Sequence, residues 1–229
     1  MLLSSGYPPS GHRLLILPQH ELQLVRRKIR SVLPRIQPMR LTRVAKPFDD
    51  PDYIFELKHD GFRALAYIEG GECKLISRNS NRFKSFAPLQ ESLGKLPVQN
   101  AILDGEVVCL NEHGVSQFNE LFSRKGKPFF YAFDLLWLDG QDLRSLPLIE
   151  RKRRLHELIK KSRFEQIIYA QHIETQGVAF FEEICARDLE GIVAKRRLSI
   201  YKSNGTGWLK IKNPKYSQAV GRHDLFKQR

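Results

Sequence analysis

Residues 56–66, with the sequence ELKHDGFRALA, constrain the fold of this chain more than any other stretch. The apolar residues in and around this stretch predict a strand over residues 53–58 and a second strand over residues 62–69. The pair Gly70-Gly71 suits a tight hairpin turn into a third strand at residues 73–77. Strands joined by connections this short must run antiparallel, which points to an antiparallel sheet.

The rest of the chain also contains more predicted strand than helix. A helix is expected over residues 149–160, where Leu155, Leu158 and Ile159 fall on one side, and another over residues 177–186. Because strands and helices do not alternate regularly, the pattern predicts an α+β domain rich in antiparallel sheet. The remaining predicted strands cover residues 101–110, 129–138, 167–171, 191–195 and 208–212.

Positive charge is concentrated toward both ends of the chain. The formal net charge is +13, and residues 22–48 contain eight Lys and Arg with no Asp or Glu. Residues 195–229 contain ten Lys and Arg and one acid, Asp224. Such clustering is typical of a surface that binds a polyanion, and it favours nucleic acid as a partner.

The cysteine and histidine spacing argues against a disulfide framework and against a zinc site. The cysteines Cys73, Cys109 and Cys185 are far apart, and the sequence has no C-x-x-C pair and no zinc-like histidine spacing. The longest early apolar run, residues 14–17, is too short for a signal sequence or a membrane span. We therefore expect a reduced, cytoplasmic protein without membrane association.

Residues 1–46 are predicted to form a basic N-terminal extension, and residues 47–229 to form the main domain. Between Pro18 and Pro34 the apolar residues recur on one face, which predicts one amphipathic helix. Residues 34–47 contain three prolines and several basic residues and are interpreted as a linker. The helix either docks on the main domain or contacts nucleic acid, and both readings stay open.

The pattern K-x-D-G-x-R at residues 58–63 is followed by further motifs in a fixed order. Five segments make up the series: KHDGFR at 58–63, SRNSNRF at 77–83, DGE at 104–106, FDLLWLDG at 133–140, and EGIVAK at 190–195 followed by WLKIK at 208–212. From residue 58 onward the chain resembles the adenylation domain of ATP-dependent DNA ligases. It is most similar to the ligase modules of bacterial end-joining systems.

This resemblance implies a covalent nucleotidyltransferase fold, which is ATP-grasp-like and rich in antiparallel sheet. It implies an enzyme, a DNA ligase (ATP), that forms a lysyl-AMP intermediate and seals a 5′-phosphate to a 3′-hydroxyl. ATP and Mg²⁺ (or Mn²⁺) are the expected cofactors. Nicked or broken duplex DNA is the expected partner, and the protein is expected to act as a monomer.

The resemblance assigns the nucleophile and the residues around the base and ribose. Lys58 is the lysine that attacks ATP, and its base lies in a predicted buried strand. Burial and neighbouring cations favour the neutral amine that such an attack needs. Glu56 and the backbone of Leu57 would read the adenine edge, and Phe133 would stack on the adenine ring. Arg63 would hold the ribose and the neighbouring phosphate.

The remaining assignments concern phosphates and metal. Arg78 resembles an arginine that contacts the sugar or the DNA 5′-phosphate. Glu190 would carry the catalytic metal, and Glu106 would take the ribose hydroxyl or assist in metal binding. Lys210 and Lys212 alternate by two, so they should point to one face of a strand, where they would grip the α-phosphate.

The chain departs from the family pattern after Lys212. Only 17 residues follow, which are too few for the OB-fold that full ligases carry. We therefore expect self-adenylation to be weakened, or a separate protein to supply an OB-fold. The segment YKSNGTGW at 201–208 has Lys202 as its one cation, where the family tends to be arginine-rich. An RNA ligase with the same chemistry, and a nick- or end-binding module without self-adenylation, stay open as alternatives.

Overall fold

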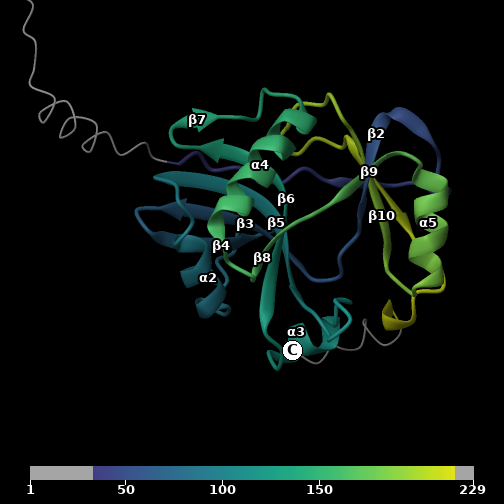
Figure 1. The fold of residues 1–229 in the computed structure, drawn as a ribbon, viewed down its shortest axis with the longest axis horizontal. Coiled ribbons are helices and arrows are strands. Elements are labelled where there is room, and N and C mark those ends of the chain that lie inside the picture. Colours follow the sequence, from purple (N-terminus) through teal and green to yellow (C-terminus); the bar gives the residue numbers. More distant parts are fainter. Residues whose placement is uncertain (1–32, 220–229) are drawn as a thin grey trace, which may run out of the picture. The chain divides into compact units, whose positions relative to one another are not determined.

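The computed structural model of the chain describes residues 33–219, and the helix predicted between Pro18 and Pro34 lies outside the described residues. The described part folds around two sheets, and helices pack against each of them (Figure 1). Within residues 33–219, no helix combines the length and the apolar character needed to cross a bilayer.

The larger sheet contains the strands that were predicted first from the sequence. Its order is β4-β3-β5-β6-β7, all antiparallel, with β8 added in parallel to β6. Gly70 and Gly71 make the predicted turn between β3 and β4, and both have positive φ angles, which glycine adopts without strain. The strands are β3 (Phe62–Glu69), β4 (Glu72–Ser77), β5 (Asn100–Cys109), β6 (Pro128–Leu138), β7 (Gln141–Asp142) and β8 (Ile167–Tyr169).

The smaller sheet brings together strands that are far apart in the sequence. Its order is β1-β11-β10-β2-β9, and the β1–β11 pair is parallel while the others are antiparallel. β2 and β10 are buried strands at its centre, so residues at their ends are held in defined positions. The strands are β1 (Leu41–Arg43), β2 (Asp50–Leu57), β9 (His172–Thr175), β10 (Gly191–Arg196) and β11 (Trp208–Lys212).

The helices cover the outer surfaces of the sheets. α4 (Leu148–Ser162) packs on β6 and β8 and buries Leu155 and Leu158, as its periodicity predicted, and α5 (Gly177–Ala186) packs on β2 and β10 (Figure 1). Shorter elements complete the described chain: α2 (Ala87–Gly94), α3 (Phe118–Ser123) and the 3₁₀ turn η1 (Ser217–Ala219).

A shared apolar cluster joins the two sheets. Leu65, Ile102 and Leu136 of the larger sheet pack with Val193 and Trp208 of the smaller sheet. Because this cluster is buried, the two sheets are held face to face, and the ends of their strands can build one site.

The N-terminal part of the described chain differs from expectation. Residues 34–47 are not a linker, because β1 lies within them and pairs with β11, and Ile36 and Met39 are buried in the cluster between the sheets. The predicted boundary between residues 46 and 47 does not coincide with the start of the compact unit, which begins at Leu33. The prolines and basic residues of this stretch led to the linker prediction, although Ile36 and Met39 are apolar residues that pack in the core.

The strand predicted at residues 167–171 is shorter in the structure, and a second short strand that was not predicted follows it. β8 ends at Tyr169 and joins the larger sheet, whereas β9 begins at His172 and joins the smaller sheet. The chain therefore crosses from one sheet to the other at residues 170–171, a change of partner that local composition does not encode.

Candidate active site

Every residue predicted to act in the site lines one of two adjoining pockets between the sheets. The larger is an open cleft of about 820 Å³, and the smaller is a narrow apolar pocket. Lys58, Arg63 and Glu106 line both pockets, so the two form one continuous site. Arg78, Glu190, Lys210 and Lys212 line the cleft, and Glu56, Leu57 and Phe133 line the narrow pocket.

Lys58 lies directly after β2, where the buried strand opens into the cleft. Its backbone N–H donates to Gly191 O at 2.9 Å, which fixes the chain at this point. Its Nζ lies 2.7 Å from Glu190 Oε2, and the side chain is 18% exposed. The antiparallel pairing of β2 with β10 explains the contact, because Glu190 directly precedes the first residue of β10.

Two further lysines line the cleft together with Lys58. Lys210 and Lys212 lie on β11 on either side of the buried Ile211, so both point into the cleft, as their spacing predicted. Lys212 Nζ lies 3.4 Å from Glu190 Oε1. Burial, followed by the charges of Lys212 and Lys58, lowers the pKa of Lys210 below its ordinary value. Such crowding of positive charge favours an anionic ligand, such as a phosphate chain.

Glu106 lies on β5 directly opposite Arg63 of β3. Burial raises the pKa of Glu106 to about 8 against the opposing charges of Lys58 and Arg63, and Glu190 adds to the rise. A cation bound beside these two carboxylates would favour the ionised form of Glu106.

The carboxylates of the cleft fit a magnesium ion that takes most of its ligands from elsewhere. Among the described residues, no group of three or more His, Cys, Asp or Glu side chains is arranged to hold a metal. Glu190 and Glu106 nevertheless line the same cleft. Mg²⁺ is commonly bound by one or two carboxylates together with substrate phosphates and water, and this pair suits that arrangement.

Glu56 is buried beside the narrow pocket and lies between two lysines. Lys152 of α4 approaches Glu56 Oε1 at 2.5 Å, and Lys195 of β10 approaches Oε2 at 2.6 Å. All three side chains are at most 3% exposed. Burial by itself raises the pKa of Glu56, but the two lysines outweigh burial and hold the pKa below its ordinary value. Glu56 is therefore an ionised acceptor that already pairs with two lysines. A bound nucleobase would have to share this carboxylate with them.

Aromatic rings form the walls of the narrow pocket. Phe133 and Trp208 meet edge to face with centroids 5.7 Å apart. Lys195 Nζ lies 4.3 Å from the Phe133 centroid and 3.9 Å from the Trp208 centroid. The position of Phe133 is compatible with the predicted stacking on a base, which stays a prediction.

His59 adds a neutral polar group to this pocket. Its ring stacks on Tyr131 with centroids 3.7 Å apart, and its Nδ1 is buried without a hydrogen-bond partner among the described residues. Burial lowers the pKa of His59 to about 3, so the ring is uncharged near neutral pH. An unsatisfied buried nitrogen next to Lys58 is suited to a bound ligand.

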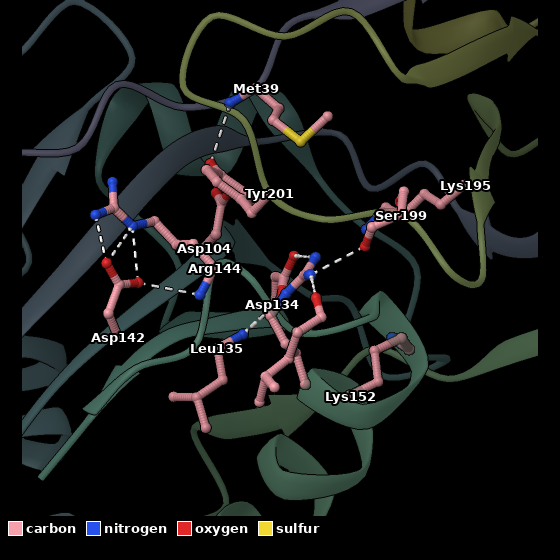
Figure 2. Close-up of polar contacts among 12 residues, drawn as sticks. Met39, Asp104, Asp134, Leu135, Asp142, Arg144, Lys152, Lys195, Ser199 and Tyr201 are labelled. Atoms are coloured by element: carbon pink, nitrogen blue, oxygen red, sulfur yellow. Dashed lines mark hydrogen bonds and ion pairs between the residues drawn. The ribbon is translucent and has the colours of Figure 1, made fainter.

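Arg63 is held largely by the protein itself. Its Nε and Nη2 donate to the two oxygens of Asp104 at 3.1 and 2.7 Å, and its Nη1 donates to Met39 O at 2.6 Å. Tyr201 donates to the same carboxylate at 2.8 Å and accepts from Met39 N at 3.1 Å (Figure 2). A bound nucleotide could contact only the remaining N–H groups of Arg63. The predicted contacts of Arg63 with the ribose and phosphate stay a prediction.

A second buried ion pair, between Arg151 and Asp134, connects the elements around the site. Arg151 of α4 donates through Nε and Nη2 to Asp134 of β6, both at 2.8 Å, and both side chains are fully buried. Arg151 also donates to Ser199 O at 3.1 Å. This network ties α4 to the larger sheet and to the loop between β10 and β11.

Several lining residues were not identified from the sequence. Lys195 and Trp208 fall inside the EGIVAK and WLKIK motifs, and the alternation along β10 and β11 was a signal that could have found them. Arg40 and Met39 line the cleft but precede the first motif, and Lys152 lies on a helix that carries no motif. No sequence signal placed these three near the site.

Taken together, the two sheets and the site between them have the arrangement of the covalent nucleotidyltransferase fold. A lysine stands between an aromatic pocket and a cleft lined by cations and two carboxylates, on a scaffold of two packed sheets. The chain belongs to the family described as ATP dependent DNA ligase domain, whose sequence model matches residues 37–212.

Known proteins similar to this chain carry ligase names. The multifunctional non-homologous end joining protein LigD of Pseudomonas aeruginosa is 32% identical over 168 residues, covering 70% of this chain and 20% of that protein. The SPbeta prophage-derived DNA ligase-like protein LigB of Bacillus subtilis is 31% identical over 193 residues, covering 81% of this chain and 70% of that protein.

A solved structure shares the fold. The mycobacterial DNA ligase D complexed with ATP and MES matches with a TM-score of 0.68 and 28% identity, covering 77% of this chain and 60% of that chain. The chain thus spans less than two thirds of this structure and about a fifth of the Pseudomonas relative.

Proposed function

We propose that this protein is an ATP-dependent DNA ligase-type nucleotidyltransferase that seals 5′-phosphate to 3′-hydroxyl ends through a lysyl-AMP intermediate at Lys58. The observation that carries the proposal is the position of Lys58 Nζ. It lies where the narrow aromatic pocket meets the cation-lined cleft, and Glu190 holds it at 2.7 Å. A nucleotide with its base in the pocket and its phosphates in the cleft would present its α-phosphate to this amine.

Three transfers follow from this placement. Lys58 Nζ attacks the α-phosphorus of ATP, an N–P bond forms, the bond to the β-phosphate breaks, and pyrophosphate leaves. The Lys58 proton passes out of the amine, and the Glu190 carboxylate is the nearest acceptor. A DNA 5′-phosphate oxygen then displaces Lys58 from the adenylate. Finally a 3′-hydroxyl attacks the activated 5′-phosphate, and AMP leaves.

The residues of the narrow pocket would hold the nucleoside. Glu56 accepts from the exocyclic amine while it stays bound to its two lysines, and the Leu57 backbone faces the base edge. Phe133 stacks on the base. Arg63 offers its remaining N–H groups to the ribose and adjoining phosphate.

The residues of the cleft would hold phosphate and metal. Lys210 and Lys212 contact the α-phosphate and offset the charge that develops during transfer. Arg78, which is exposed at the cleft edge, contacts the sugar or the DNA 5′-phosphate. Glu190 and Glu106 hold Mg²⁺ (or Mn²⁺), which neutralises phosphate charge when bound.

The partner we propose is nicked or broken duplex DNA, bound by a monomer in the cytoplasm. The net charge of +13 and the cations of the cleft support a polyanionic partner. An OB-fold supplied by a separate protein stays a prediction, and a size measurement with and without nicked DNA would test the monomer.

Covalent labelling tests the proposal directly. Incubation with α-labelled ATP and Mg²⁺ should label the wild-type protein and should fail to label Lys58→Ala, while GTP should give no label. Lys74→Ala, which changes an exposed lysine on β4, is the matched control and should label normally. Equal labelling of Lys58→Ala would refute the assignment.

The substrate class is tested in the same preparation. Sealing of a nicked DNA duplex should exceed sealing of the same nick in RNA, and the reverse result would identify an RNA ligase. Tight binding of nicked DNA without any labelling would identify an end-binding module.

A further inference from the structure

The segment that follows β11 packs against the loops that carry Lys58 and Glu190. Residues 213–219, called the latch below, contact in turn the loop of Glu190, the loop of Lys58 and the chain that follows β5. The proposed chemistry assigns them no role. Their contacts nevertheless fall on the two loops that carry the reacting groups.

The latch first holds the loop that carries Glu190. The backbone N–H of Asn213 donates to Glu190 O at 2.9 Å, and its Nδ2 donates to Leu189 O at 3.0 Å. Asn213 is 7% exposed, so these bonds are shielded from water. They fix the backbone from which Glu190 reaches Lys58.

The latch next holds the loop that carries Lys58. The hydroxyl of Tyr216 donates to Asp60 Oδ2 at 2.9 Å, and these side chains are 5% and 4% exposed. Asp60 lies two residues after Lys58, in the connection between β2 and β3. The next residue, Gly61, leaves no room for a side chain, because a Cβ there would lie 2.1 Å from Val107 O.

The end of the latch bonds to two loops, the one before β10 and the one after β5. Ser217 donates to Asp188 through its backbone N–H at 2.9 Å and through its hydroxyl. Gln218 Nε2 donates to Ser116 O at 3.1 Å, on the chain that follows β5. Tyr216 is therefore flanked by residues that have hydrogen-bond partners of their own, Asn213 on one side and Ser217 and Gln218 on the other.

We propose that Tyr216 is a positioning residue that holds the Lys58 nucleophile in place through Asp60. The inference rests on the proposed function, and it deepens the account of the adenylation step. A buried carboxylate that loses a hydrogen-bond donor is less stable in its position, which favours a shift of the loop that carries it. The short 58–61 connection transmits that movement to Lys58, and its Nζ leaves the line of attack.

Two measurements on Tyr216→Phe test this role. Hydrogen exchange at the backbone amides of residues 58–63 should accelerate by roughly tenfold or more, while exchange in β5 and β6 stays unchanged. Single-turnover labelling by saturating ATP should slow by on the order of 10- to 100-fold, the range set by one hydrogen bond to a charged group. The KM for ATP should stay unchanged, because the residues proposed to contact the base and the phosphates are not altered.

Matched variants separate positioning from general stability. Tyr53→Phe removes the hydroxyl of another buried tyrosine, which accepts from Arg196 Nε at 3.0 Å in the middle of β2, and it should change neither readout. Gln218→Ala frees the end of the latch and keeps the Tyr216 hydroxyl, so it should give an intermediate effect. In an Asp60→Asn background, Tyr216→Phe should add less than it does alone.

The outcomes distinguish this inference from the proposed function. Unchanged exchange at residues 58–63 in Tyr216→Phe, or an equal rise throughout the domain, overturns the positioning role. Normal labelling together with faster local exchange also overturns it, because the loop would then be free without consequence. If the wild-type protein takes no label, the proposed function fails, and the exchange result still decides whether Tyr216 holds the loop.

Discussion

The buried carboxylate of Glu56 and its two lysines lead to an asymmetric prediction for protein stability. The side chains of Glu56, Lys152 and Lys195 are each at most 3% exposed, so all three lie in the core. When all three are ionised, the group carries one negative and two positive charges. Removing one lysine should therefore cost much less than removing the carboxylate.

The expected losses follow from which charges remain. Lys152→Met leaves a neutral pair of Glu56 and Lys195, so the loss is that of the charge-assisted bond to Glu56, about 1.5–3 kcal/mol, together with the bond of Lys152 Nζ to Ala170 O at 3.0 Å. Glu56→Gln leaves two buried ammonium groups without a carboxylate, for which about 3–5 kcal/mol is expected. Lys161→Met, on the exposed face of the same helix, should leave the free energy of unfolding unchanged within error.

The stability of Glu56→Gln should depend on pH, and the direction of that dependence follows from the lysine pKa values. Burial, the largest influence, already lowers the pKa of Lys195 below the ordinary 10.5 in the wild-type protein. Without Glu56, the folded protein would release a lysine proton at lower pH than the unfolded chain. Between the lowered pKa and 10.5 the unfolded chain binds more protons, so the stability of Glu56→Gln should rise with pH.

Urea unfolding at pH 7 and pH 9 measures both effects. Glu56→Gln should be the less stable variant at pH 7 and should recover part of its loss at pH 9, relative to the wild type. A smaller loss in Glu56→Gln than in Lys152→Met, or no recovery at pH 9, would refute the charge reasoning.

Three further predictions concern the site and its surroundings. Glu190→Ala should fold normally and lose adenylation by orders of magnitude, as measured by label transfer; undiminished rates in the presence of a chelator would contradict a metal role. Deletion of residues 1–32 removes five Lys and Arg, and each lost phosphate contact should reduce the log–log salt slope of DNA binding by about 0.9. An unchanged slope would show that this segment does not touch DNA. Gly61→Ala should destabilise the protein by about 1–3 kcal/mol in thermal unfolding, because the added Cβ would lie 2.1 Å from Val107 O. Gly207→Ala should be tolerated, because its Cβ would meet only a Met39 side-chain atom at 3.4 Å.

Local patterns were enough to predict the strands and helices that carry the motifs. The ranges 62–69, 177–186 and 208–212 agree with β3, α5 and β11, because apolar periodicity and glycine turns act over a few residues. The same local reasoning placed Lys210 and Lys212 on one face, which the structure confirms.

The short elements escaped prediction for a physical reason. β1 and β9 are stabilised by β11 and β2, partners that are distant in sequence, and their own residues carry little strand signal. α2 and α3 are short helices whose buried leucines find their contacts only in the assembled core.

The motifs identified the candidate site residues, and the tertiary structure determined which side chains position them. K-x-D-G-x-R, EGIVAK and WLKIK named Lys58, Glu190 and the two lysines of β11, because each motif is local and its residue types follow from the chemistry. The lysines that hold Glu56, the carboxylate that holds Arg63, and the tyrosine that holds Asp60 come from distant segments. Such partners are chosen by which strands pair and which helix covers them, since a buried charge takes whatever counter-charge the packed chain brings within reach.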